Sequence, residues 1–243
     1  MPTARVDDIR IYYEIHGEGV PLLLVGGLAN DVADYTERST IVADLARRYK
    51  VVVFDNRGVG RTDKPDIRYS IPMMSEDAAG LLAALGIGRA NVLGVSMGGR
   101  IALDLALRHP ELVERLVLVS TSARVVRTWR RSFILSVLKM LPLARDKYPQ
   151  PYYAFARQLH ASGSYDCTDR LPEIHVPTLI LHGKDDRTAP YALAEEMHAR
   201  IPDSRLVAFA GGHLFLFLHP RQFVDAVLAF LSSPRGAGPG PNP

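Results

Sequence analysis

The sequence predicts an α/β fold in which helices cover both faces of a mainly parallel sheet. Short apolar runs rich in Val, Leu and Ile alternate with segments of helical periodicity along most of the chain. Each right-handed strand-helix-strand crossover places its helix over one side of the sheet, so this alternation favours a central parallel sheet. Active-site residues of such folds lie at the carboxyl ends of the strands. The expected strands are residues 9–15, 21–25, 50–54, 90–95, 115–119, 177–181 and 205–209, and the expected helices are residues 37–48, 74–85, 97–108, 191–200 and 221–231.

The composition is that of one compact domain. The chain has 243 residues, of which 47% are hydrophobic and 23% are charged, so it can bury a large core. The net charge is only +3 and the basic residues are dispersed, which does not favour nucleic-acid binding. No segment has the apolar run of a signal peptide or a membrane span, so a soluble cytoplasmic protein is expected. The single cysteine, Cys167, excludes an intramolecular disulfide, and no zinc-binding pattern is present.

A Gly-x-Ser-x-Gly motif lies between an expected strand and an expected helix. It reads Gly94-Val95-Ser96-Met97-Gly98. Glycine is needed on both sides of the serine because a Cβ atom at either position would collide with the tight turn. The amides at the start of the next helix lie at the same point and favour negative charge there. The motif therefore predicts Ser96 as a nucleophile at a strand-to-helix turn.

A serine nucleophile needs a base and an orienting acid within hydrogen-bond reach. Among the eight histidines, His213 is the preferred base because it follows two glycines directly after the strand at residues 205–209. His182 lies at the end of another strand and is expected to be packed in the core. Asp185 and Asp186 both follow the strand at residues 177–181, and either of them could instead cap the next helix. The residues alone leave the choice of acid open.

Four motifs together resemble those of the α/β-hydrolase fold superfamily, and the likeness extends over nearly the whole chain. Besides the serine motif, residues 54–62 resemble the family's Asp-x-Arg-Gly-x-Gly-x-Ser loop. Gly183-x-x-Asp186-x-x-x-Pro190 resembles its acid loop, and Gly212-His213 resembles its histidine loop. The order serine, acid, histidine is also that of the family. The resemblance implies that Asp186 is the acid and that the protein is similar to the serine esterases of this fold.

The resemblance also implies how the chain is divided. A hydrolase core is expected at residues 1–122 and 176–233, with a short helical cap at residues 123–175 inserted after the sixth sheet strand. Residues 234–243 are rich in Pro and Gly and are expected to be disordered.

Two loops depart from the family's pattern. Where the family usually has His-Gly after the third strand, this chain has Gly26-Gly27-Leu28, which predicts a more flexible loop. The resemblance implies that the backbone amides of Leu28 and Met97 form the oxyanion hole. The family's glutamate after the catalytic histidine is absent, and residues 214–218 are apolar, either as pocket lining or as ordinary core.

The cap supplies the candidate substrate-binding residues. Its aromatic side chains Trp129, Phe133, Tyr152 and Tyr153, together with Leu214 of the histidine loop, are expected to line the pocket. Residues 123–170 carry nine Arg or Lys residues and only three Asp residues. This excess is either a solvated face whose arginine stems cover apolar surface or a field that attracts acidic substrates.

The sequence thus predicts a serine hydrolase that cleaves small carboxylic esters through an acyl-enzyme intermediate, with no metal or organic cofactor. An enol-lactone or carbon-carbon bond hydrolase of the same fold is the alternative. A non-catalytic binding protein is the competing class. No oligomeric state is predicted.

Overall fold

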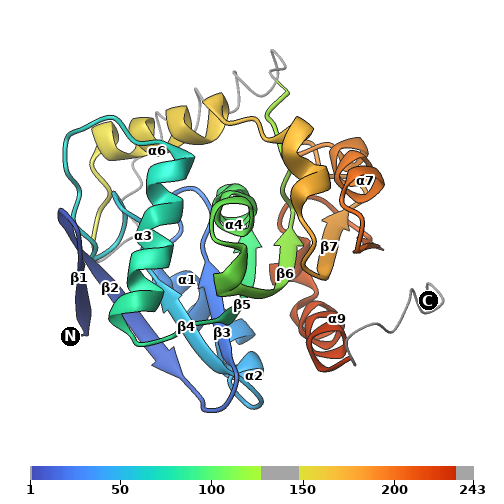
Figure 1. Ribbon diagram of the computed structural model, residues 1–243, viewed down its shortest axis with the longest axis horizontal. Helices are drawn as coiled ribbons and strands as arrows, with labels where there is room; N and C mark the ends of the chain where they lie inside the picture. The colour runs from blue at the N-terminus through green and yellow to red at the C-terminus, as the bar shows by residue number, and fades with distance from the viewer. Residues whose placement is uncertain (1, 127–147, 234–243) are drawn as a thin grey trace.

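A single mixed sheet forms the centre of the computed structural model, which describes residues 2–126 and 148–233 (Figure 1). Its strands, within that part of the chain, run in the order β1-β2-β4-β3-β5-β6-β7-β8. β2 pairs antiparallel with β1 and β4, and all other neighbours are parallel. The strands are β1 (Thr3–Val6), β2 (Ile9–His16), β3 (Pro21–Val25), β4 (Lys50–Phe54), β5 (Ala90–Val95), β6 (Val113–Val119), β7 (Thr178–Gly183) and β8 (Ser204–Phe209).

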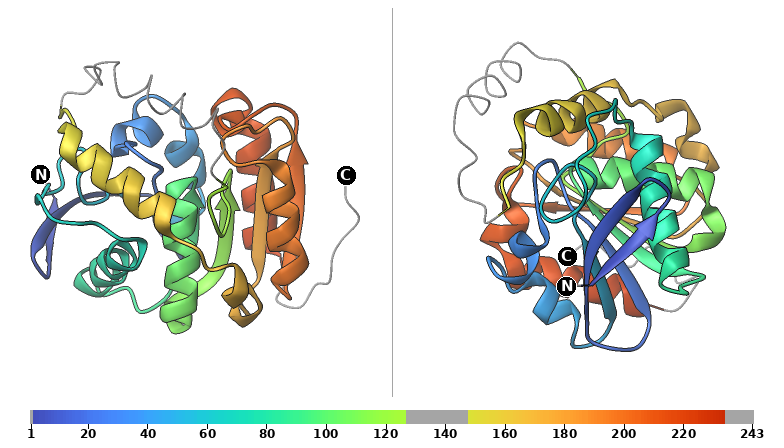
Figure 2. Two further views of the ribbon diagram at one scale, coloured as in Figure 1. Left: turned by 90° about the horizontal axis from the view of Figure 1, so that it is seen from above. Right: turned by 90° about the vertical axis from the view of Figure 1, so that its left-hand side faces the viewer.

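Helices cover both faces of this sheet (Figures 1 and 2). Successive side chains of a strand point to opposite faces, so Leu23 and Val25 of β3 pack with α3 and α4, whereas Leu22 and Leu24 pack with α1, α2 and α9. The helices are α1 (Val32–Thr36), α2 (Ile41–Leu45), α3 (Ile71–Ala84), α4 (Met97–Arg108), α6 (Tyr152–Ser164), α7 (Tyr191–Arg200), α8 (Phe215–Leu218) and α9 (Pro220–Ser232), with 3₁₀ turns η1 (Pro110–Leu112) and η2 (Thr168–Glu173). The two apolar layers fix the positions of the strand ends, and therefore also the positions of the loops that follow the strands.

Three of the elements that differ from the sequence-based expectation have a local physical reason. The helix expected at residues 37–48 is wrong as one unit: it is replaced by α1 and α2, and Ser39 between them donates its hydroxyl to the Tyr35 carbonyl, a local bond that competes with helix continuation. α3 begins at Ile71, three residues early, because Ser70 caps it. β1 was not expected, since only Val6 of its four residues is buried.

The segment between β6 and β7 leaves and rejoins the sheet through a narrow neck. Cys167 donates its amide to the Ala123 carbonyl at 3.2 Å, and Arg124 and Asp166 form an isolated antiparallel bridge. Beyond this neck, α6 lies at the end of the sheet toward which β5 and β6 point (Figure 1). Trp129, Phe133 and the tail at residues 234–243 lie outside the described residues.

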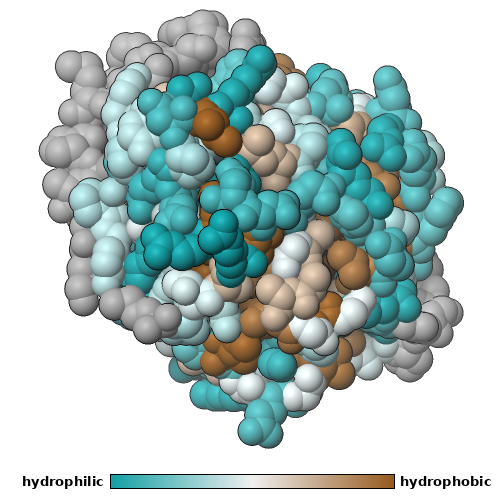
Figure 3. Space-filling model, turned by 60° about the vertical axis from the view of Figure 1, so that its left-hand side comes forward, coloured by the Kyte–Doolittle hydropathy of each residue, from teal (hydrophilic) through white to brown (hydrophobic). Residues whose placement is uncertain are grey.

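The described surface mixes polar and apolar side chains. The face in Figure 3 is largely hydrophilic, with apolar side chains gathered in the lower part of the view. Within residues 2–126 and 148–233, no helix is long and apolar enough to span a bilayer.

Candidate active site

Ser96 lies at the turn between β5 and α4 in a backbone conformation that is rare for a non-glycine residue. Its φ is 54° and its ψ is −112°. Glycines on either side make this turn possible, because a Cβ atom on Gly94 would overlap the backbone of Gly98, and one on Gly98 would overlap the Val25 carbonyl. Thr121 donates its hydroxyl to the Ser96 carbonyl at 2.7 Å. The turn therefore holds the Ser96 side chain at the carboxyl end of the sheet.

The structure brings Ser96 into contact with one histidine, His213, which follows β8. His213 Nε2 lies 3.0 Å from Ser96 Oγ, and the same ring's Nδ1 lies 2.7 Å from Asp186 Oδ2. With Nδ1 protonated, the ring donates to the carboxylate and accepts from the serine hydroxyl. Ser120 Oγ also donates to the His213 carbonyl at 2.9 Å, which ties the histidine loop to the end of β6. Three side chains that follow three different strands thus form one hydrogen-bonded chain.

Of the two candidate acids, Asp186 contacts His213 and Asp185 does not. Asp186 is buried, and its Oδ1 accepts the amides of Thr188 and Ala189, whereas Asp185 is exposed. The backbone of the acid loop is bonded to the histidine loop, because the Asp185 amide donates to the Gly211 carbonyl at 3.0 Å. The spacing between the carboxylate and the imidazole therefore depends on backbone contacts as well as on the side chains.

His182 is a second histidine at the acid. As expected from the sequence it is packed in the core, fully buried at the end of β7, with Nε2 2.7 Å from the Ala189 carbonyl. The same nitrogen lies 3.4 Å from Asp186 Oδ2. Sequence reasoning missed this contact, because a histidine that ends a strand is equally typical of ordinary core packing. His182 therefore helps to hold Asp186 in place.

The environment of Asp186 favours its ionised form. Burial of the carboxyl raises its pKa, but hydrogen bonds from His182 and His213, the nearby His213 charge and the Ala189 amide outweigh burial and hold the pKa of Asp186 well below its usual range. The carboxylate is consequently available to stabilise positive charge on His213.

The Gly26-Gly27-Leu28 loop lies directly beside Ser96. A Cβ atom on Gly27 would lie 3.5 Å from the Ser96 Cβ atom. Asn56 Nδ2 donates to the Gly26 carbonyl at 3.0 Å, and the Gly27 amide donates to Tyr35 Oη at 3.3 Å. These buried contacts anchor the loop despite its two glycines. On the other side of Ser96, Met97 is the first residue of α4, so its amide has no acceptor inside the helix.

The expected pocket-lining residues are dispersed. Leu214 follows His213 and is 58% exposed, whereas Phe215 and Leu216 are buried in the core, where Phe215 stacks on Phe209. The apolar run after His213 is therefore core at these two positions and accessible at Leu214.

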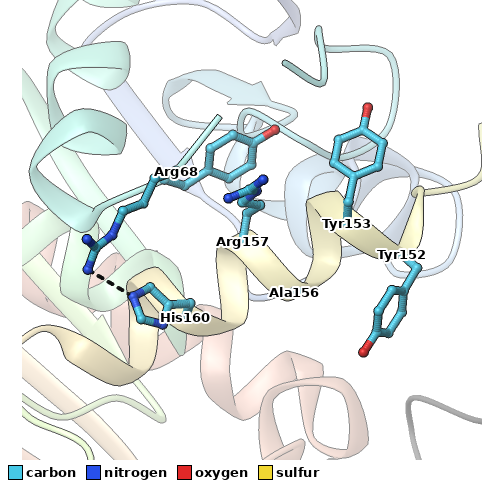
Figure 4. A pocket seen from close by; sticks show the side chains of 7 residues that line it. Arg68, Tyr152, Tyr153, Ala156, Arg157 and His160 are labelled. Carbon is cyan, nitrogen blue, oxygen red and sulfur yellow. Dashed lines mark hydrogen bonds between the residues drawn. The ribbon is translucent and has the colours of Figure 1, made fainter. Parts of the chain in front are cut away.

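Tyr152 and Tyr153 leave the first turn of α6 in opposite directions (Figure 4). Tyr153 donates its hydroxyl to the Lys64 carbonyl at 2.6 Å, and Tyr152 is exposed. Both line a surface groove of about 460 Å³ that includes none of Ser96, Asp186 and His213; its other lining residues are Arg68, Tyr69, Ala156, Arg157 and His160. The assignment of Tyr152 and Tyr153 to a pocket around Ser96 stays a prediction.

No group of three His, Cys, Asp or Glu side chains is arranged to hold a metal ion in residues 2–126 and 148–233. The candidate site consists of one hydroxyl, one imidazole, one carboxylate and neighbouring backbone amides.

A family model described as the alpha/beta hydrolase fold matches residues 20–150. The chain belongs to the α/β hydrolase fold family. It is 30% identical to a protein of Azorhizobium caulinodans named as the carbamate hydrolase RutD, a match that covers 95% of this chain and 98% of the relative. It is 28% identical to the 2-hydroxy-6-oxo-6-(2'-aminophenyl)hexa-2,4-dienoic acid hydrolase of Metapseudomonas resinovorans, over 89% of this chain and 85% of that protein.

Among solved structures, the enol-lactonase from Burkholderia xenovorans LB400 superposes with a TM-score of 0.84 and 27% sequence identity, and the match covers 96% of this chain and all of that one. These relatives share the fold, but their names describe different substrates: a carbamate, a dienoic acid and an enol-lactone. Because the chain belongs to the α/β hydrolase family, we conclude that this protein is a hydrolase.

Proposed function

We propose that this α/β hydrolase is a serine hydrolase that cleaves carboxylic esters through an acyl-enzyme intermediate. The observation that carries the proposal is the unbroken contact from Asp186 Oδ2 through both nitrogens of His213 to Ser96 Oγ, at 2.7 and 3.0 Å. A hydroxyl with this partner becomes a nucleophile when the imidazole takes its proton.

In the first half of the reaction, Ser96 Oγ forms a bond to the acyl carbon while its proton moves to His213 Nε2. Asp186 stabilises the resulting imidazolium, and the amides of Leu28 and Met97 stabilise the negative oxygen. The bond to the alcohol oxygen then breaks, and the imidazolium returns its proton to that oxygen. Water repeats the same steps on the acyl-enzyme, which releases the acid and restores Ser96.

Enol-lactone hydrolysis is the second candidate. It is supported by the TM-score of 0.84 to an enol-lactonase, a match that covers 96% of this chain. A lactone is an internal ester, so Ser96, His213 and Asp186 would act on it in the same way. Which substrate is preferred, an open ester or a lactone, depends on the shape of the substrate. The carbamate and dienoic acid hydrolases among the relatives make carbamates and vinylogous diketones the necessary comparison substrates.

Two measurements test the proposal. A serine-directed phosphonate should label the wild-type protein at Ser96 and leave Ser96→Ala unlabelled. Values of kcat/KM should then be compared for aryl esters of increasing acyl length, an enol-lactone, a carbamate and a vinylogous diketone. The ester assignment fails if the phosphonate does not react, or if the carbamate or the diketone is preferred over every ester and lactone.

A further inference from the structure

A fully buried glutamine connects the helix above the sheet to the loop beside Ser96. Gln158 lies on the inner face of α6 and has no exposed surface. Its Oε1 accepts the Ala29 amide at 3.2 Å, and its Nε2 donates to the Arg57 carbonyl at 2.8 Å. A third bond comes from Gln150 Nε2, which donates to Oε1 at 3.0 Å. One side-chain amide thus joins α6 to two loops of the hydrolase core.

The bond to Ala29 acts on the peptide that follows Leu28. Ala29 has a φ of 60°, a conformation that costs energy for a residue with a Cβ atom and that persists only when its surroundings impose it. Gln158 supplies such a constraint, because it fixes the Ala29 amide, which belongs to the Leu28–Ala29 peptide.

The peptide between Gly26 and Gly27 is also anchored. Asn56 donates to its carbonyl and Tyr35 accepts from its amide. The Gly27–Leu28 peptide, which carries the Leu28 N–H, therefore lies between two fixed peptides. Its own carbonyl accepts the Asn30 amide at 3.2 Å, and since the peptide bond is trans, the Leu28 N–H points the opposite way. The orientation of that N–H is determined by contacts on both sides.

We propose that Gln158 is a positioning residue: from α6 it sets the orientation of the Leu28 amide beside Ser96 and so couples the placement of this helix to stabilisation of the oxyanion. The inference rests on the proposed function. It follows that a displacement of α6 changes the rate of the chemical step, in addition to access to the site.

The test compares Gln158→Met, which keeps the length of the side chain but offers neither bond, with Gln158→Glu, which keeps an acceptor for Ala29. Gln158→Met should lower kcat per active site about tenfold, a fraction of the loss when an oxyanion donor is removed. KM for a neutral aryl ester should change by less than about threefold, since ground-state binding is not altered. Gln158→Glu should recover part of the lost kcat.

Gln150→Leu is the matched control, because it removes the third bond to Gln158 and leaves those to Ala29 and Arg57 in place. Its kcat should remain close to that of the wild type. Titration of active sites with a phosphonate corrects each variant for unfolded protein, and the Ki of a trifluoromethyl ketone should rise in Gln158→Met by the factor by which kcat/KM falls.

One outcome would overturn the inference: an unchanged kcat per active site in Gln158→Met, with or without a loss of active sites, which would leave Gln158 with a purely stabilising role. Failure of the proposed function is seen separately. In that case the wild type and Ser96→Ala would turn over the ester equally, whatever Gln158 does.

Discussion

The losses of kcat caused by substituting Ser96, His213 and Asp186 should not be additive. Under the proposed mechanism, Ser96→Ala and His213→Ala each remove the same proton-transfer step, so each should lower kcat by several orders of magnitude, on the order of 10⁶ if the residues act as one unit. The double variant should be little worse than either single one. Steady-state hydrolysis of an aryl ester measures kcat for all three variants, and circular dichroism checks that each variant is folded.

Asp186→Asn should also be damaging, because it removes the charge that stabilises the His213 imidazolium. Asp185→Asn is its matched control, since Asp185 is adjacent in sequence but exposed. Its kcat should stay within a few-fold of the wild type. Loss of turnover in Asp185→Asn with retention in Asp186→Asn would refute the choice of acid.

The lowered pKa of Asp186 has a consequence for folding stability. An acid whose pKa is depressed in the folded state contributes stability above its unfolded pKa of about 4 and loses that contribution as the pH falls further. The difference in unfolding free energy between the wild type and Asp186→Asn should therefore be larger at pH 5 than at pH 3. Urea titrations at pH 5, 4 and 3 measure it, and a difference that grows toward pH 3 would contradict the assignment.

Residues that belong to a sequence motif were predictable, and those recognised only by their contacts in the folded structure were not. Ser96 has glycines at fixed spacing, and His213 follows two glycines at a strand end. His182 and Gln158 have no such marker: His182 is recognised only by its contact with Asp186, and Gln158 only by hydrogen bonds such as the one to Ala29, 129 positions away. Tyr153 was expected at the substrate because it is an aromatic residue of the expected cap; the structure shows its hydroxyl bonded to the Lys64 carbonyl, and its place at the substrate stays a prediction.

Among the elements, the junction of β5 and α4 has a tight steric requirement. Gly98→Ala should lower the unfolding free energy by about 1–3 kcal/mol, because its Cβ atom would push against the backbone at Val25 and Gly26, which cannot move without shifting the end of β3. Turnover should fall as well, since the same shift moves the loop that carries Leu28. Chemical denaturation and ester hydrolysis measure the two effects.

Gly88→Ala is the control for this substitution. Gly88 is exposed, and a Cβ atom there would have no neighbour within 4 Å. Its stability should stay within about 0.5 kcal/mol of the wild type. Equal losses from the two substitutions would mean that helix or loop entropy, rather than the close approach at the junction, dominates.

Strands and helices with strong periodicity were correctly predicted from the sequence to within a few residues, as for β3, β4, β5, α4 and α7. The boundaries that differ depend on side-chain bonds that hydrophobic periodicity does not register. α1 starts at a capping box formed by Asp31 and Asp34, and the hydroxyl of Ser39, between α1 and α2, bonds to the Tyr35 carbonyl. Short edge strands such as β1 leave too few buried residues to be recognised.

On the scale of the whole molecule, the basic residues of the insertion either form a solvated face or attract acidic substrates, and the salt dependence of kcat/KM distinguishes the two. Three of them lie in the described part of the chain, and each is paired: Arg124 with Glu196, Arg157 with Asp66, and Arg170 with Glu173. Paired charges produce little long-range field, so at these three positions the contacts favour a solvated face over steering of acidic substrates.

The kcat/KM values of a neutral ester and of its carboxylate-bearing analogue should therefore respond to added salt in the same way. Steering would be screened over about 8–10 Å at physiological ionic strength, and it would show as a selective loss for the carboxylate substrate. Rates measured from low to high ionic strength distinguish the two cases. A carboxylate substrate that is preferred at low salt and loses its advantage at high salt would restore the steering interpretation.

The neck at the base of the insertion also bears on how this fold can change over evolutionary time. The two ends of the segment are held together by the contacts between Ala123 and Cys167 and between Arg124 and Asp166. An insertion between these ends therefore lengthens a loop whose ends already meet. Lengthening a closed loop is inexpensive in entropy, about 0.6 kcal/mol for each doubling. Insertions and deletions in this segment can therefore accumulate with little effect on the sheet, whereas α6 is constrained by the bonds of Gln158. Variation among relatives should concentrate between the neck and α6, and specificity can diverge there while the chemistry at Ser96 is retained.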